Sequence, residues 1–464
     1  MRLRGQESTA DLVILAEIRT SFRRNPRDAA IAALAVPALG TLAIDPIVTI
    51  VDTAWVARLG TVPLAALAVA GAVFAAVFSV FNFVQVAITP LIAAEVGRQR
   101  LDRAGAVAKG ALAIAVGLGV VCAVAFIALT PAITDLFGAE ADVAADASAY
   151  LRIRFLALPM MLIASVGHGV YRGHHDTKTP LYVAIGMNVV NLVLDPILIF
   201  GLDMGIEGAA WATVIAQTIA AGWFLVLMFW RQRQRLGLDR MGGSLRGLPI
   251  GQVLSAGWPL VIRSMALLGV LTATTVAVAR IGTDQTAAHQ VALQVWLFLA
   301  FVLDSYAIAA QAMVGTDFGA GDVPKARSIS NRLLALGFLT GIGLSVLLLV
   351  TAPLVPILFD LDDSVRGHLR DIYLFVVLTQ PLTALVYVWD GVGIGATAFR
   401  YMALSMVAAG AAAIGSLVLI GDTLTGVWVS LLILTLVRLV TLAGWHQWGR
   451  LSSGRGSFPS SRAV

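Results

Sequence analysis

The sequence predicts an all-α membrane protein with twelve transmembrane helices, arranged as two parallel-repeat lobes of six helices each. Three observations lead to this class. Of the 464 residues, 59% are hydrophobic and 13% are charged, whereas a soluble domain carries about 25% charged residues. Apolar segments that can cross about 30 Å of hydrocarbon recur along the chain, and the short alternating strands of a membrane β-barrel are not seen. The two halves also repeat each other.

The apolar segments define the helices in chain order. Each has about 20 or more mostly apolar residues, which is the length that one span requires. The predicted ranges are 29–57, 64–95, 104–132, 147–171, 180–201, 205–231, 251–280, 284–318, 325–356, 370–393, 400–420 and 425–448. An even number of spans places both termini on the same side of the membrane.

The repeat is visible in individual residues. An offset of 222 residues brings Pro37 onto Pro259, and the run 56–61 onto the run 278–283. Duplicated hydrophobic halves are typical of a secondary transporter whose substrate path lies between the repeats. The acidic residues do not follow the repeat, because Asp52 corresponds to a threonine in the second half.

Lysine and arginine concentrate in alternate loops, and the loops between those are short and poor in them. The basic stretches are 2–27, 98–103, 231–246, 325–327 and 450–462. By the positive-inside rule both termini are cytoplasmic, in a multi-pass protein of the plasma (inner) membrane. Six helices per half then make the halves parallel repeats. The net charge of +5 reflects these loops and does not indicate a nucleic-acid partner.

These features predict five parts of the chain. They are a cytoplasmic N-terminal leader, an N-lobe, a cytoplasmic linker, a C-lobe and a disordered cytoplasmic tail, at 1–28, 29–231, 232–250, 251–448 and 449–464. The leader lacks a cleavable signal sequence. Residues 9–24 could form an amphipathic helix on the lipid surface, but a partly ordered leader is the simpler interpretation. The one cysteine, Cys122, excludes disulfides within the chain and any cysteine-based metal site.

Ionisable groups inside a membrane span are costly, so each is a functional candidate. Two helices of the first half carry polar groups spaced so that they share one face. They are Asp45, Thr49 and Asp52 on the helix 29–57, and Asn188, Asn191 and Asp195 on the helix 180–201.

Counting residues from the helix ends places Asp52, Asp195 and Thr213 in the outer half of the membrane. Two carboxylates with amide and hydroxyl oxygens could hold Na⁺ or share a proton, because two nearby carboxylates in a low dielectric do not both ionise easily. For Thr49, Thr213 and Asn188 a structural hydrogen bond to a neighbouring helix is the simpler interpretation. A structural bond rarely needs a carboxylate, so Asp52 and Asp195 indicate function.

Two prolines mark expected bends in the first helix. Pro37 and Pro46 remove backbone hydrogen bonds, which frees carbonyl groups and allows a helix to bend. Asp45 directly precedes Pro46. It could belong to the coupling site or be a structural residue, and both readings stay open.

The second half carries a different set of polar residues. Arg263 and Asp304 lie near the middle of adjacent antiparallel helices, where they could form a structural ion pair or face the substrate. Asn82 corresponds to Asp304 in the repeat, and Gln294 could line a wet cavity, so both are candidates for the substrate path. Asp390 is expected at the cytoplasmic interface.

Several catalytic motifs are absent from the sequence. It contains no GxxxxGK[ST] loop, so the chain hydrolyses no ATP itself, and no HExxH or GxSxG motif. We therefore expect a protein that is not an enzyme and has no cofactor beyond a coupling ion, H⁺ or Na⁺.

Five stretches together resemble the MATE (multidrug and toxic compound extrusion) family, and the last two resemble its DinF-like branch. The stretches are Pro37 with 52–55 and 60–67, 171–180, 191–196 with 208–213, 303–307, and 389–397. The resemblance implies a V-shaped pair of six-helix lobes and the antiport of organic compounds against Na⁺ or H⁺. The bendable first helix of the family has its proline at the position of Pro37.

The resemblance also implies roles for single residues. In related proteins the residues at the positions of Asp52, Asn191, Asp195 and Thr213 form an N-lobe cation or proton site, and Na⁺ is one possible ion there. All four residue types are present in this chain. Asp45 is not part of that pattern.

We therefore expect a multidrug efflux antiporter that exports cationic or amphipathic organic compounds and works as a monomer in the lipid bilayer. Two other functions were weighed. A flippase for a lipid-linked precursor would need a large basic cavity, and intramembrane arginine is sparse. An intramembrane aspartyl protease could use Asp52 and Asp195, but the GxGD-type motif is absent and the repeat would be unexplained.

Overall fold

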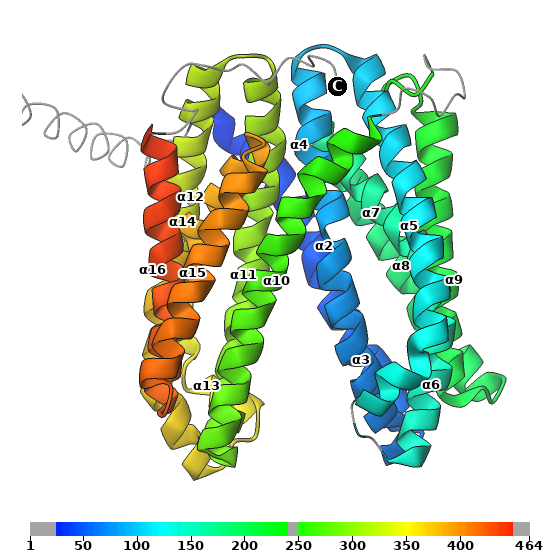
Figure 1. Cartoon of the computed structure of the whole chain (residues 1–464), viewed down its shortest axis with the longest axis vertical. Coiled ribbons are helices and arrows are strands. Elements are labelled where there is room, and N and C mark those ends of the chain that lie inside the picture. Colours follow the sequence, from blue (N-terminus) through cyan, green and yellow to red (C-terminus); the bar gives the residue numbers. More distant parts are fainter. Residues whose placement is uncertain (1–24, 137, 139, 240–248, 449–464) are drawn as a thin grey trace, which may run out of the picture. The chain divides into compact units, whose positions relative to one another are not determined.

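The computed structural model describes residues 25–136, 138, 140–239 and 249–448 (Figure 1). Within these ranges the regular elements are all helices, and none is a strand. Most of the predicted leader, part of the linker and the predicted tail (1–24, 240–248 and 449–464) lie outside the described residues, so those predictions stay untested.

The first half of the chain forms eight α-helices and two short π-helical turns. In order these are α2 (Pro26–Ala57), α3 (Thr61–Phe81), α4 (Phe83–Gly97), α5 (Leu101–Leu136), α6 (Ala141–Phe155), α7 (Leu158–Gly173), α8 (Lys178–Pro196), η1 (Ile197–Gly201), α9 (Gly205–Val226) and η2 (Leu227–Arg231).

The second half forms seven α-helices. In order these are α10 (Ile250–Ile281), α11 (Thr283–Gly319), α12 (Val323–Thr351), α13 (Leu354–Leu358), α14 (Asp363–Gly395), α15 (Phe399–Ile420) and α16 (Leu424–Trp448). The predicted helix 325–356 is divided between α12 and α13, and Pro353 lies between them. Proline has no main-chain N–H group, so Pro353 cannot continue the ladder of helical hydrogen bonds, which accounts for the break.

Eleven helical stretches of the described ranges are long and apolar enough to cross a membrane, and the bent pair α6 and α7 brings the number to as many as twelve. The axes of α6 and α7 differ by 50° at their break. Each of the twelve predicted spans corresponds to one of these stretches, so the predicted all-α membrane fold is confirmed. The sequence did not predict the bend within the fourth span.

The helices group into two compact units. One unit comprises residues 37–265, and the other comprises residues up to 36 together with those from 266 onward. Both α2 and α10 are therefore divided between the units, α2 at Pro37 and α10 after Met265. The predicted lobes, 29–231 and 251–448, follow the sequence repeat rather than these contacts and stay a prediction.

Glycine allows the helices of the unit 37–265 to approach closely. A Cβ atom added at Gly167 on α7 would lie 2.4 Å from the ring of Phe224 on α9, and one at Gly119 on α5 would lie 2.5 Å from the backbone of Pro159. Real Cβ atoms essentially never make such short contacts. Small residues at helix contacts are how membrane helices pack without a hydrophobic driving force.

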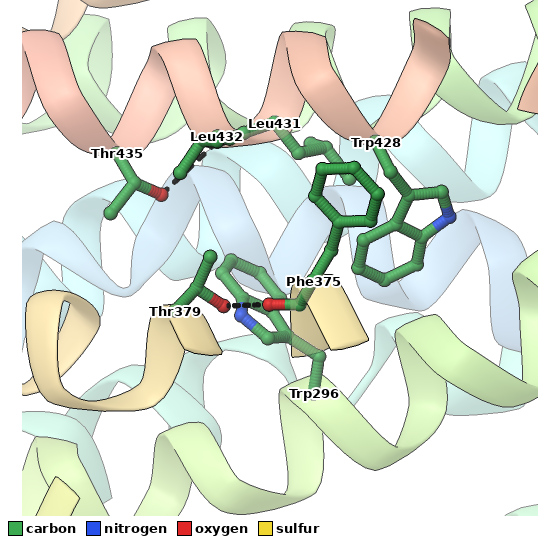
Figure 2. A pocket seen from close by; sticks show the side chains of 7 residues that line it. All are labelled: Trp296, Phe375, Thr379, Trp428, Leu431, Leu432 and Thr435. Carbon is green, nitrogen blue, oxygen red and sulfur yellow. Dashed lines mark hydrogen bonds between the residues drawn. The ribbon is translucent and has the colours of Figure 1, made fainter. Parts of the chain in front are cut away.

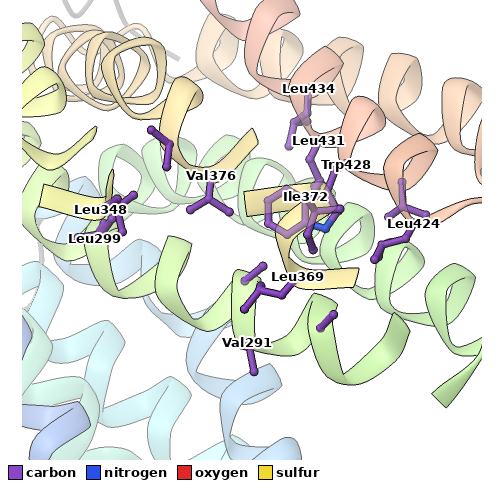
Figure 3. Packing of buried hydrophobic residues seen from close by; sticks show 14 of the residues in the cluster. Val291, Leu299, Leu348, Leu369, Ile372, Val376, Leu424, Trp428, Leu431 and Leu434 are labelled. Atoms are coloured by element: carbon purple, nitrogen blue, oxygen red, sulfur yellow. The ribbon is translucent and has the colours of Figure 1, made fainter. Parts of the chain in front are cut away.

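In the other unit α14 occupies the centre of the packing. Leu369, Ile372 and Val376 of α14 are buried against Leu299 of α11 and Leu431 of α16, and Figure 3 shows this cluster. α14 packs along α11, α12 and α16. A helix covered on several sides is apolar nearly all round, so a charged residue on α14 needs a specific partner.

The first turn of α2 is fixed to α12 within this second unit. The guanidinium of Arg332 donates to both carboxylate oxygens of Asp28, from Nε to Oδ1 and from Nη2 to Oδ2, each at 2.7 Å. Arg27 also donates from Nη1 to the hydroxyl of Ser328, at 2.5 Å. A bidentate pair of this kind fixes direction as well as distance, so the start of α2 is anchored before the chain reaches Pro37.

Candidate functional site

Asp52 of α2 and Asp195 of α8 meet inside the unit 37–265. Their carboxyl groups lie within hydrogen-bonding reach of each other, and the side chain of Asp195 is almost fully buried. Asp52 Oδ1 and Asp195 Oδ2 are buried, and neither has a hydrogen-bond partner among the described residues. Two buried acceptor oxygens without a donor are unfavourable. A proton or a cation held between them would supply the missing partner.

Asn191 and Thr213 complete the same cluster. Asn191 Nδ2 donates to Asp195 Oδ1 and to Thr213 Oγ1, both at 3.4 Å. The hydroxyl of Thr213 donates in turn to the carbonyl oxygen of Ala209, at 3.0 Å, so its lone pairs accept from the amide. Asn191 and Asp195 are four residues apart on α8 and therefore share one face, and α9 packs along that helix. The structure thus brings the four family-pattern residues together.

Asp45 lies two turns before Asp52 on α2 and has a partner of its own. Asn188 Nδ2 donates to Asp45 Oδ1 at 3.2 Å and to the carbonyl oxygen of Ala184 at 2.9 Å. Asn188 is buried, whereas Asp45 is exposed. Thr49 donates to the main-chain oxygen of Asp45, at 2.9 Å, which is a local bond within α2. A role of Asp45 in coupling stays a prediction.

Two residues that sequence reasoning missed lie beside the acid pair. Arg154 of α6 exerts its charge on both Asp52 and Asp195, and Tyr150, one turn earlier, is close to Arg154 and to both acids. Arg154 lies within the predicted span 147–171, and that position inside a span was the signal that could have identified it.

The candidates for the substrate path, Arg263, Asp304, Asn82 and Gln294, are divided between the two units. Arg263 belongs to the unit 37–265 and Asp304 to the other unit, so their pairing stays a prediction. Asn82 lies at the break between α3 and α4, where its side-chain oxygen accepts a hydrogen bond from Gln85. Gln294 is an exposed residue of α11. No shared substrate path follows from these contacts.

Asp390 of α14 has a buried partner, and its expected position at the cytoplasmic interface stays a prediction. Its side chain is buried and forms an ion pair with Arg438 of α16, with side-chain exposures of 7% and 8%. The two residues are far apart in the sequence, so periodicity within one helix does not reveal the pair. Arg438 is thus the specific partner that a buried carboxylate on the covered helix α14 requires.

The cluster around Asp52 offers a limited set of ligands to a metal ion. In the part of the chain that the structure describes, no group of three or more His, Cys, Asp or Glu side chains could hold a metal. A hard cation takes oxygen ligands. Na⁺ would have the two carboxylates and the Thr213 hydroxyl, but Asn191 presents its nitrogen to the cluster and would have to turn its amide over.

A small pocket lies in the second unit, between α11, α14 and α16 (Figure 2). Its walls are mostly aromatic and aliphatic, formed by Trp296, Phe375, Thr379, Trp428, Leu431, Leu432 and Thr435. The hydroxyls of Thr379 and Thr435 donate to main-chain oxygens one turn earlier on their own helices. The exposed surface of the pocket is therefore mostly apolar and aromatic, but the pocket is far too small to hold an organic molecule.

Comparisons with known proteins agree with this architecture. The MatE family model matches residues 37–197 and 259–418, so the second match begins 222 residues after the first (259 − 37). Protein DETOXIFICATION 44, chloroplastic, of Arabidopsis thaliana is 34% identical over 424 residues, covering 88% of this chain and 80% of that protein. DNA damage-inducible protein F of Escherichia coli (strain K12) is 28% identical over 426 residues, covering 90% and 92%.

A solved structure has the same fold. It is the outward-facing conformation of a multidrug resistance MATE family transporter of the MOP superfamily, with a TM-score of 0.83 and 20% sequence identity. The match covers 94% of this chain and 98% of that chain. The matched repeats, the helical architecture and the relatives agree with the DinF-like resemblance of the sequence. The chain belongs to the MATE family and is a multi-pass membrane transporter, not an enzyme.

Proposed function

We propose that this transporter is a secondary antiporter, which exports cationic or amphipathic organic compounds in exchange for H⁺ or Na⁺. The observation that carries the proposal is the contact between Asp52 and Asp195, with one buried, unpartnered oxygen on each. Structural packing does not require two carboxylates to face each other in a low dielectric. A site that takes up and releases a positive charge does require them.

Coupling needs only that the ion and the organic substrate prefer different conformations. α2 could link the coupling site to a change of conformation. It carries Asp52, and its residues are divided between the two units at Pro37. Pro37 and Pro46 each lack a main-chain donor, so α2 bends there at lower cost than an unbroken helix would. Charge neutralisation at Asp52 would thereby favour one bend of α2 over another.

The substrate class is inferred from one observation: the structural relative is described as a multidrug resistance transporter. We further propose that the protein acts as a monomer in the plasma membrane with both termini in the cytoplasm, on the charge pattern of the loops.

A lipid flippase fits the site less well. Such a protein needs free cationic side chains for a phosphate headgroup, whereas Arg154 lies beside two acids and Arg438 is paired with Asp390. Both arginines are thus already balanced by carboxylates. Their presence in the spans does not create a basic cavity.

The test is transport by the purified chain in proteoliposomes loaded with the fluorescent cation ethidium. A proton gradient and a sodium gradient are imposed separately, each with the membrane potential clamped. We expect at least one gradient to drive export against the ethidium concentration. Export that follows neither gradient would refute antiport.

A further inference from the structure

Arg154 is held beside the acid pair without being bonded to it. Its guanidinium carbon lies 4.3 Å from the centre of the Phe74 ring of α3, which is a favourable position for a cation on an aromatic face. Its Nε and Nη1 atoms are buried and have no hydrogen-bond partner in the described ranges. The guanidinium lies within hydrogen-bonding reach of the Tyr150 hydroxyl, and it acts on the two acids through its charge.

That charge is directed at the candidate coupling site. The charges that act on Asp52 are those of Asp195 and Arg154, and the charges that act on Asp195 are those of Asp52 and Arg154. Tyr150, which is uncharged in its ordinary state, is the other titratable group near all three. Among the described residues, Arg154 is thus the one cation within electrostatic reach of both acids.

The helices packed against α6 add no second cation at this point. α6 packs along α3, α5 and α9. α3 carries no titratable side chain, and α9 carries only Glu207, in its first turn. The titratable side chains of α5 are Asp102, Arg103, Lys109, Cys122 and Asp135, and none of them is among the charges that act on Asp52 or Asp195.

We propose that Arg154 is the built-in counter-ion of the Asp52–Asp195 site, and that it excludes Na⁺ and leaves the proton as the coupling ion. The proposal deepens the proposed antiport function and rests on it for the site's role in transport. Arg154 is a specificity-determining residue in this view, because it contacts neither the organic substrate nor the exchanged ion.

H⁺ and Na⁺ would both neutralise the site, so the exclusion depends on where each positive charge would lie. Two ionised carboxylates and one guanidinium leave a single net negative charge. A proton neutralises that charge by bonding to one carboxyl oxygen, which then donates to the other acid and satisfies both unpartnered oxygens. Na⁺ would instead remain a full charge beside the guanidinium, and it would also require the Asn191 amide to turn over.

The test measures Na⁺ binding by calorimetry on the purified full-length chain at fixed pH, with KCl replacing NaCl as the ionic-strength control. The parent should show no Na⁺-specific heat. Arg154→Met should gain saturable Na⁺ binding, at least about tenfold tighter than the parent, because a like charge beside the ion has been removed. Asp195→Asn added to Arg154→Met should abolish this heat, which assigns the binding to the acid pair.

Two further variants separate charge from shape, and a third serves as a substitute for Arg154→Met. Arg154→Lys keeps the positive charge and should remain as indifferent to Na⁺ as the parent. Arg152→Met removes the same charge from an exposed position two residues earlier on α6 and should also behave like the parent. Arg154→Gln carries the same expectation as Arg154→Met and replaces it if the methionine variant fails to fold.

The results distinguish this inference from the proposed function. The exclusion of Na⁺ would be overturned if the parent bound Na⁺ and Asp195→Asn removed that binding. It would also be overturned if Arg154→Met and Arg154→Gln folded and did not bind Na⁺. Calorimetry needs no transported substrate, so a parent that exports ethidium on neither gradient would sink antiport and leave the counter-ion result standing. If the parent exports ethidium on a proton gradient but the Arg154 variants do not bind Na⁺, only the inference about Arg154 is refuted.

Discussion

Replacing Arg438 with methionine should destabilise the unit that contains α14 and α16 strongly. The pair that it forms with Asp390 is buried, with exposures of 8% and 7% for the two side chains. Methionine keeps much of the length of arginine but carries no charge. The Asp390 carboxylate would then stay buried without the guanidinium, at a cost of about 3–5 kcal/mol in the free energy of unfolding. Arg438→Met should therefore lower the unfolding temperature in detergent markedly.

The double variant Asp390→Leu with Arg438→Met separates the cost of an unmatched charge from the cost of lost packing. Two buried charges replaced by apolar side chains of similar volume are often neutral or stabilising, so most of the lost stability should return. The exposed pair of Asp363 and Arg366 provides the control, since Arg366→Met should change stability by about 0–1 kcal/mol. If Arg438→Met is as stable as the parent, the buried Asp390 carboxylate does not depend on Arg438, and the reasoning is refuted.

Two other predictions concern packing and topology. Gly167→Ala should lower the unfolding temperature, because its Cβ would lie 2.4 Å from the Phe224 ring. Gly71→Ala should not, because a Cβ at that position would have nothing within 4 Å. Equal effects of the two substitutions would mean that the α7–α9 contact is looser than described. Cysteines placed at Gln234 and at Asp142, after removal of the native cysteine, should react with an impermeant reagent from opposite sides of the membrane, and labelling from the same side would contradict the twelve-span arrangement.

The spans could be predicted because the membrane restricts the length and composition of each helix. The repeat could be predicted because residues of the two halves match at a fixed offset. Hydrocarbon thickness sets the length and apolarity of each helix, so the ranges agree with the structure within a few residues at most ends. Polar residues inside such spans are few, and their spacing on one helix gives a shared face. That is why Asp52 and Asp195 could be named as candidates before their contacts were known, whereas the site roles of Asn191 and Thr213 came from the family resemblance.

The remaining features depend on contacts between helices that lie far apart in the sequence. Periodicity shows that Arg154 lies on a different face from Arg152, but it does not show that this face meets two acids from α2 and α8. The pair of Asp390 with Arg438 is another contact of this kind. The 50° bend between α6 and α7, by contrast, has a local cause, because Pro159 at the start of α7 has no N–H group to bond to the carbonyl of Phe155 at the end of α6.

Gradient-driven ethidium export by Asp195→Asn in proteoliposomes tests the central claim most directly, with Asp142→Asn as the matched control on the exposed surface of α6. Asparagine is nearly isosteric with aspartate, so folding should be retained while the exchangeable charge is lost. The account predicts that Asp195→Asn loses export against a concentration gradient, that Asp52→Asn does the same, and that Asp142→Asn exports like the parent. Full gradient-driven export by both Asp52→Asn and Asp195→Asn would contradict it.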